Sequence, residues 1–191
     1  MEFGSTIHVA IDSIGRMFVT QQGDPPILVF DKDGNYLEGW GKDFLLDAHG
    51  LFITSTDDVL VVDRDGHKVY KFDSTGNLQM TLGTGKPSWL QPFNHPSDVA
   101  QSPRGEIFVA DGYGNSSVHV FSAEGKHLRS WGKPGCEPGE FSTPHGIWVD
   151  HNSKVYVADL QNSRVQIFSE DGDFIAEWGK GLYHPMDIWI D

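Results

Sequence analysis

Basic residues are scarce in this sequence. Its 191 residues include 14 Lys and Arg against 27 Asp and Glu, which gives a formal net charge of −13 at pH 7. Proteins that bind nucleic acid or an anionic membrane surface do so through clustered Lys and Arg. We therefore expect neither nucleic acid nor membrane as a partner.

Cysteine and long apolar runs are also nearly absent. Cys136 is the single cysteine, which excludes an internal disulfide. No apolar run approaches the ~20 residues of a membrane-spanning helix. The start MEFGST lacks the basic and apolar regions of a signal peptide, and it resembles a cloning-derived leader. We assign residues 1–6 to this leader. A native leader could have been removed, so the sequence does not indicate the cellular compartment.

Helical periodicity is missing as well, and in its place the chain repeats itself. Four segments end alike, as VFDKDGNYLEGWGK, KFDSTGNLQMTLGT, VFSAEGKHLRSWGK and IFSEDGDFIAEWGK. Their marker glycines, Gly34, Gly76, Gly125 and Gly172, are 42, 49 and 47 residues apart. Each repeat contains three further short β-prone runs bounded by turn residues. The Asp-Gly type pair before the last run predicts a tight hairpin.

Four-stranded units of ~40–45 residues in tandem predict an all-β fold of the β-propeller type. Residues 7–191 then hold four four-stranded blades, and MDIWID at residues 186–191 is the first strand of a fifth. Trp40, Trp131 and Trp178 share one position in the repeat and are predicted to pack between blades. The open end blades predict self-association through their apolar faces.

Residues 132–172, GKPGCEPGEFSTPHGIWVDHNSKVYVADLQNSRVQIFSEDG, resemble the NHL repeat closely, and the resemblance covers residues 7–191. A narrower resemblance lies in DAHGLF, FNHPSDVA, VADGYGNSSVHVFSAEGKHLRSWG and STPHGIWV. These motifs are similar to those of peptidyl-α-hydroxyglycine α-amidating lyase and its bacterial relatives. That family implies a six-bladed ring, of which this chain is a part. It also implies an enzyme that releases glyoxylate from a C-terminal hydroxyglycine and leaves a peptide amide.

Two histidines, His49 in DAHGLF and His145 in STPHGIW, stand directly before equivalent strands. In a six-bladed ring, residues two blades apart are about 120° apart around the axis, so three such histidines would converge as zinc ligands do. The resemblance implies a histidine on alternate blades, with the third on a sixth blade that this chain lacks. The alternative is that each histidine caps backbone groups at the channel mouth.

The resemblance implies further site residues. Tyr113 in DGYGN matches a tyrosine proposed as the base on the substrate hydroxyl, although a structural hydrogen bond is an equal alternative. Gln22 (or Gln21) and Leu160 stand where the family has arginines, which hold a substrate carboxylate. Gln22 is retained as a substrate-binding candidate. The backbone carbonyl of Leu51 matches a calcium ligand in the channel.

Three aspartates, Asp63, Asp111 and Asp159, recur once per repeat at a strand end. This periodicity indicates a structural role, because an aspartate there can accept backbone hydrogen bonds across a turn.

Two functions follow for the chain. The first is a zinc-dependent, amidating-lyase-like enzyme acting on a small peptide-like substrate, with weak or absent activity expected from the missing arginines. The alternative is a non-catalytic NHL propeller that serves as a binding platform for a protein or peptide.

Overall fold

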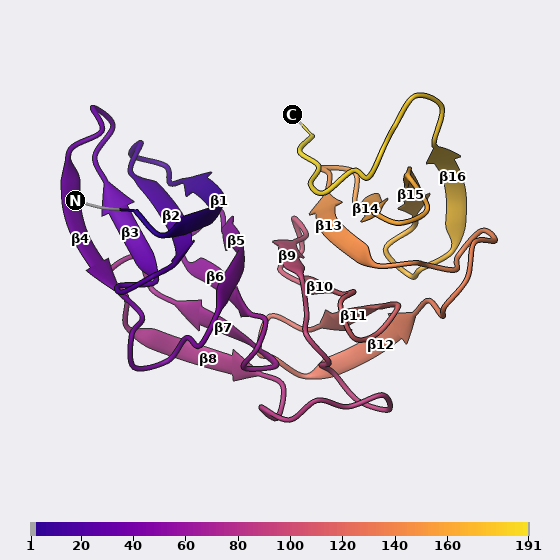
Figure 1. The fold of residues 1–191 in the computed structure, drawn as a ribbon, viewed down its shortest axis with the longest axis horizontal. Coiled ribbons are helices and arrows are strands. Elements are labelled where there is room, and N and C mark those ends of the chain that lie inside the picture. Colours follow the sequence, from indigo (N-terminus) through magenta and orange to yellow (C-terminus); the bar gives the residue numbers. More distant parts are fainter. Residues whose placement is uncertain (1–2, 191) are drawn as a thin grey trace.

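The computed structural model describes residues 3–190, which form an all-β architecture without helix (Figure 1). Sixteen strands make four antiparallel sheets of four strands each, and every sheet uses its strands in chain order. Each sheet corresponds to one predicted repeat, so the predicted propeller blades are confirmed. Within the described residues no helix is long and apolar enough to cross a membrane.

The sixteen strands divide evenly among the blades. Blades one and two contain β1 (Ser5–Ile11), β2 (Met17–Gln22), β3 (Ile27–Phe30), β4 (Tyr36–Trp40), β5 (Ala48–Ile53), β6 (Val59–Asp63), β7 (Lys68–Phe72) and β8 (Leu78–Leu82). Blades three and four contain β9 (Asp98–Gln101), β10 (Ile107–Asp111), β11 (Ser117–Phe121), β12 (His127–Trp131), β13 (Pro144–Val149), β14 (Val155–Asp159), β15 (Arg164–Phe168) and β16 (Phe174–Trp178). The first strand thus begins two residues inside the segment assigned to a leader.

The turn between the third and fourth strands is the same in every blade. Gly34, Gly76, Gly125 and Gly172 have φ angles of +84°, +83°, +85° and +91°. Glycine adopts this left-handed conformation without the steric penalty of a Cβ atom. The amide of each glycine donates to the carbonyl three residues earlier, over 2.9–3.0 Å. The repeated glycine of the sequence is therefore a repeated hairpin turn.

The four blades form an open arc, with blade one and the C-terminal segment on either side of a notch (Figure 1). The predicted first strand of a fifth blade is wrong for the described part of MDIWID, because residues 180–190 contain no strand. Such a strand forms its ladder with the second strand of its own blade, and residues 3–190 provide none. Asp191 lies outside the described residues.

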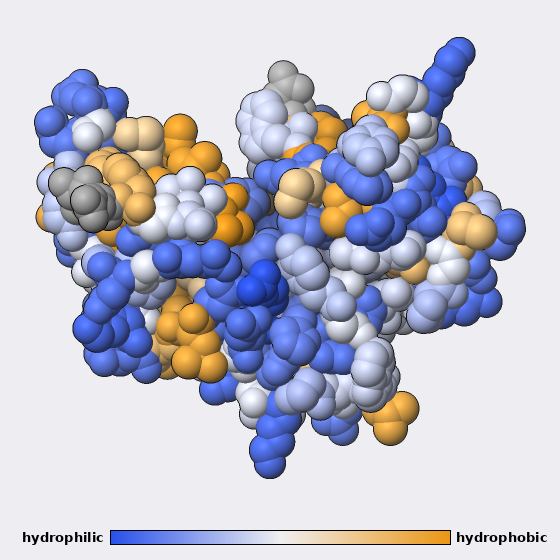
Figure 2. All heavy atoms as spheres, viewed as in Figure 1, coloured by the Kyte–Doolittle hydropathy of each residue, from blue (hydrophilic) through white to orange (hydrophobic). Residues whose placement is uncertain are grey.

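Apolar side chains face the notch from both sides (Figure 2). Val9 and Ile11 of β1 and Trp189 of the C-terminal segment are exposed there. In a propeller these faces pack against a neighbouring blade. The notch therefore exposes surface of the kind that the other blades bury.

Three tryptophans were predicted to pack between blades, and two of them, Trp40 and Trp131, do so. The ring of Trp40 lies 5.0 Å from that of Phe72 in blade two, and the ring of Trp131 lies 5.7 Å from that of Phe168 in blade four. Trp178 differs, because its side chain is half exposed and its ring meets only Tyr156 of its own blade. No blade among the described residues follows blade four to cover it.

Trp40 and Trp131, which are partly buried, each pack on the hairpin glycine of the next blade. A Cβ atom on Gly76 would lie 2.9 Å from the ring of Trp40, and one on Gly172 would lie 2.8 Å from the ring of Trp131. The equivalent Gly34 of blade one has no atom within 4 Å of a Cβ position among the described residues. Gly76 and Gly172 are thus required for two reasons, the left-handed turn and the close approach of the neighbouring tryptophan ring.

Replacing Gly172 with alanine is expected to lower the free energy of unfolding more than the same change at Gly34. Both alanines adopt a left-handed conformation, at about 1–2 kcal/mol each. Only the Gly172 variant also overpacks the ring of Trp131, at about 1–3 kcal/mol more. Urea denaturation followed by circular dichroism measures both variants. Equal losses at the two positions would contradict this packing account.

The strand-end aspartates tie each blade to the loop before its first strand. Asp63 accepts the amide of Leu46 over 3.1 Å, and Asp111 and Asp159 accept the equivalent amides over 2.9 and 2.7 Å. All three carboxylates are buried. In blade one the same position is Gln21, whose Oε1 accepts the amide of Gly4 over 2.8 Å. These four residues therefore have a structural role. Because Gln21 is one of them, Gln22 is the remaining candidate for substrate binding at this place.

Candidate functional site

The two histidines singled out by the sequence lie side by side at the mouth of the channel. His49 is the second residue of strand β5 and His145 the second residue of strand β13, and their ring centroids are 5.3 Å apart. Both side chains are buried. The structure therefore brings together two residues that are ninety-six positions apart in the chain.

The glycine after each histidine explains the repeated His-Gly pair. A Cβ atom on Gly50 would lie 2.6 Å from Asp98 Oδ1, and one on Gly146 would lie 2.8 Å from the Cα atom of Asp187. The ladder also shifts register at these two places, between Ala48 and Leu51 and in the same place in β13. Glycine thus allows β5 to approach Asp98 of β9, and β13 to approach Asp187 of the C-terminal segment.

A backbone carbonyl of the neighbouring blade fixes each imidazole. His49 Nδ1 donates to the carbonyl of Ser97 over 2.7 Å, and His145 Nδ1 donates to that of Met186 over 2.6 Å. A carbonyl only accepts, so the proton of each neutral ring is on Nδ1. The Nε2 lone pair of each ring is then directed away from the carbonyl, as in metal-binding histidines.

Tyr113 bridges the two lone pairs. Its hydroxyl oxygen lies 3.1 Å from His49 Nε2 and 2.8 Å from His145 Nε2. A hydroxyl has one proton, so it donates to one nitrogen and leaves the other without a donor. Two imidazole nitrogens and one phenol oxygen, all electron-pair donors, therefore form one cluster. Such a cluster suits a cation.

Burial keeps these groups neutral at neutral pH. It lowers the pKa of His49 to about 4 and lowers the pKa of His145 in the same direction. It also raises the pKa of Tyr113, an effect that the nearby Arg64 guanidinium opposes. Neutral imidazoles are the form that binds metal, so no proton has to leave either ring first.

The donor types fit zinc, which takes three protein ligands at a catalytic site. Residues 3–190 hold no group of three or more His, Cys, Asp and Glu side chains arranged for a metal ion. On blade three and in the C-terminal segment the equivalent positions are Ser97 and Met186, which give their carbonyls to the histidines. The chain thus contributes two imidazoles and one phenol.

Gln22 is linked to this cluster indirectly, because it bonds to Asp47, which pairs with the Arg64 beside Tyr113. Its exposed amide donates to Asp47 Oδ1 over 2.9 Å. The backbone amide of Leu160, the other position where an arginine is missing, donates to the carbonyl of Thr143 over 3.1 Å. Among the described residues, no hydrogen bond joins either side chain to the histidines or Tyr113.

Arg64 is a site residue that the sequence interpretation missed. Its guanidinium carbon lies 5.3 Å from the centroid of the Tyr113 ring, and its Nε lies 2.8 Å from Asp47 Oδ2. Arg64 follows the strand-end Asp63 directly, as Gln22 follows Gln21 and Leu160 follows Asp159. An alignment of the repeats on the strand-end residue would have placed Arg64 with the two missing arginines.

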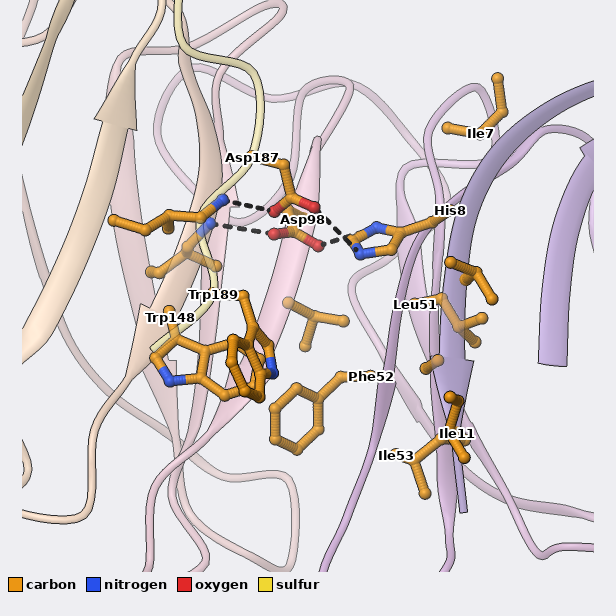
Figure 3. Close-up of a pocket in the computed structure, with 15 residues that line it drawn as sticks. Ile7, His8, Ile11, Leu51, Phe52, Ile53, Asp98, Trp148, Asp187 and Trp189 are labelled. Carbon is orange, nitrogen blue, oxygen red and sulfur yellow. Dashed lines mark hydrogen bonds and ion pairs between the residues drawn. The ribbon is translucent and has the colours of Figure 1, made fainter. Parts of the chain in front are cut away.

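A cavity of about 600 Å³ is lined by the first strands of the four blades and by the C-terminal segment (Figure 3). At one end His8 lies 3.8 Å from Asp98 Oδ1 and 3.4 Å from Asp187 Oδ2. Burial raises the pKa of Asp98 to about 7, and its Oδ1 has no hydrogen-bond partner among the described residues. At the other end the walls are aromatic, with Trp148 and Trp189 in contact.

Leu51 lines this cavity between its polar and aromatic ends (Figure 3). It is buried, and it follows the Gly50 that touches Asp98. Leu51, the position implied for a calcium-binding carbonyl, thus lines the same cavity as the buried carboxylate of Asp98.

Comparison with known proteins identifies propellers throughout. A family model described as a 6-bladed beta-propeller matches residues 92–179. A streptogramin B lyase structure superposes with a TM-score of 0.74 at 16% sequence identity, over 93% of this chain and 55% of that one. At this identity the structural likeness concerns the fold.

Sequence relatives fall into two groups. NHL repeat-containing protein 3 of Mus musculus is 34% identical over 83% of this chain and 50% of its own length. A protein of Caenorhabditis elegans described as a probable peptidyl-α-hydroxyglycine α-amidating lyase is 36% identical over 71% of this chain and 41% of its own length. The chain spans about half the length of these curated relatives.

Proposed function

Because the chain is an NHL-repeat β-propeller with relatives among the amidating lyases, we propose that its channel mouth is a zinc-dependent carbon–nitrogen lyase site. One observation carries the proposal. His49 and His145 both turn Nε2 to a single hydroxyl that can satisfy only one of them. A substrate with a C-terminal hydroxyglycine suits the site, because its hydroxyl and its carboxylate are close together.

His49 and His145 would hold zinc through Nε2, since Nδ1 of each ring is bonded to a carbonyl. Bound there, zinc would supply a Lewis acid that polarises a substrate hydroxyl. In the reaction the hydroxyl loses its proton, its carbon–oxygen bond becomes a carbonyl, the carbon–nitrogen bond breaks, and the amide nitrogen gains a proton. The products are glyoxylate and a peptide amide.

Tyr113 is placed to accept that hydroxyl proton. Burial raises the pKa of Tyr113, so the phenol acts as a base only where a cation opposes burial. The Arg64 guanidinium over its ring acts in that direction. The tyrosine therefore depends on its charged neighbours for catalysis. The expectation of weak activity, which rests on Gln22 and Leu160, remains a prediction.

Calcium is proposed at the cavity wall beside Leu51. Calcium prefers oxygen ligands, including backbone carbonyls and carboxylates. Leu51, Asp98 and Asp187 all line the cavity, and Asp98 keeps an unpaired oxygen there. Calcium in this position would offset the buried negative charge of Asp98.

A non-catalytic binding platform is the second candidate function. The observation that favours it is the aromatic end of the cavity, where Phe52, Trp148 and Trp189 form an apolar wall (Figure 3). Apolar clefts with a few polar groups are typical ligand sites. A peptide side chain could occupy this end without any reaction at the mouth.

Metal analysis of the purified protein separates the two functions. The protein is incubated with one equivalent of zinc per chain, dialysed and analysed by mass spectrometry. We expect near-stoichiometric zinc, and glyoxylate release from a hydroxyglycine peptide only in the zinc-loaded protein. Zinc at the background level of a dialysed buffer would overturn the lyase proposal and leave the platform.

A further inference from the structure

Arg64 occupies a position that the propeller uses once in every blade. The residue that follows the strand-end acceptor of each blade is Gln22, Arg64, Gly112 and Leu160 in blades one to four. Because each follows the same strand end, all four lie at the rim of the channel mouth. Arg64 is the one cationic side chain among these four.

The guanidinium of Arg64 is held by one edge. Its Nε donates to Asp65 Oδ1 over 3.0 Å and lies 2.8 Å from Asp47 Oδ2. Asp47 is itself fixed by the amide of Gln22, over 2.9 Å. Within residues 3–190, the contacts of Arg64 with acidic groups all run through Nε. The Nη1 and Nη2 edge is thus free of a carboxylate partner, and the Arg64 side chain also hydrogen-bonds Tyr113.

This free edge lies next to the proposed metal site. The guanidinium carbon is 5.3 Å from the centre of the ring whose hydroxyl contacts both imidazoles. Arg64 and Tyr113 are both partly exposed, so a molecule from solvent can reach them. An anion bound here would be attracted by Arg64 and meet only neutral imidazoles.

We propose that Arg64 is the carboxylate anchor of this mouth, and that Asp47 and Gln22 hold it in place. The ligand it would take is a short 2-hydroxy acid, whose carboxylate pairs with the Nη edge and whose hydroxyl reaches Tyr113 and the histidines. Arginine binds a planar carboxylate through two parallel hydrogen bonds. The inference rests on the proposed function for its substrate class, and it assigns the anchor to blade two.

Glycolate is the probe, because it has one carboxylate and one neighbouring hydroxyl. Its affinity is measured by isothermal titration calorimetry at low ionic strength, for the wild type, Arg64→Gln and Arg64→Lys. We expect Arg64→Gln to weaken binding about tenfold or more and Arg64→Lys to weaken it less, because a charged hydrogen bond is lost or changed. Ethylene glycol, which lacks the carboxylate, should bind wild type and Arg64→Gln alike.

Arg104→Gln is the matched control, since it removes the same charge from an exposed side chain paired with Glu170. It should bind glycolate as the wild type does. Wild-type protein that does not bind glycolate, or Arg64→Gln binding within twofold of wild type, would overturn the inference.

The two proposals fail separately. Zinc uptake without any dependence of glycolate binding on Arg64 would remove the anchor and leave the metal site. Glycolate binding that depends on Arg64 in protein unable to take up zinc would remove the lyase and leave the anchor. Zinc uptake by Arg64→Gln equal to that of wild type shows that the mouth of the variant is still folded.

Discussion

Replacing Asp159 with alanine is expected to lower the free energy of unfolding by about 3–5 kcal/mol. Its buried carboxylate accepts the amide of Ser142 over 2.7 Å and Arg164 Nε over 2.9 Å. It also accepts the side-chain amides of Asn162 and Gln166. Alanine removes all four acceptor contacts and leaves the buried Arg164 charge uncompensated on that side.

Asp171 is the matched control for this change. Its carboxylate is largely exposed and lies 4.0 Å from Arg129. Alanine there should alter the free energy of unfolding by no more than about 0.5 kcal/mol. Urea denaturation followed by circular dichroism measures both variants. A loss below about 1 kcal/mol for Asp159→Ala would mean that the hydrogen bonds at the strand end do not secure the blade.

Replacing His49 with alanine is expected to weaken zinc binding by roughly a hundredfold or more. Zinc sites with four ligands bind with about 10–16 kcal/mol, which is roughly 3 kcal/mol per ligand, and we expect a similar loss when one of the two imidazoles is removed here. His145→Ala should have the same effect, because the two rings have equivalent contacts on equivalent strands. Competition with a zinc-binding dye measures the affinity of each variant.

His151→Ala is the control for zinc, because His151 is an exposed residue of the turn between β13 and β14. It should bind zinc as tightly as the wild type. Unchanged affinity in both His49→Ala and His145→Ala would place any bound zinc elsewhere in the protein. The lyase proposal would then lose its metal site.

The blades could be predicted from the sequence because every level of it repeats. Turn glycines, strand runs and tryptophans recur together, and each recurs for a local reason such as the left-handed angle of Gly76. The strand predicted at MDIWID failed because a strand depends on its partner as well as on its own residues. The prediction that Trp178 packs between blades failed in a similar way. Its place in the repeat matches that of Trp40 and Trp131, but no blade among the described residues lies next to it.

The candidate site could be predicted only in part. His49 and His145 stand out because they repeat, but the carbonyls of Ser97 and Met186 that orient them carry no signal in the sequence. A backbone acceptor is available at every residue. Arg64 could not be predicted from the family resemblance, because the arginines of that family correspond to Gln22 and Leu160 in other blades. Arg64 lies in blade two, whereas the two missing arginines belong to blades one and four.

The exposed Trp178 and the open hairpin at Gly34 are two halves of a contact that the chain makes elsewhere. In that contact a tryptophan of one blade meets a glycine of the next, so its two sides differ. If two copies associate through these faces, as the open blades suggest, they join head to tail and not about a two-fold axis. The angle between blades then decides whether such an assembly closes into a small ring or continues as a filament.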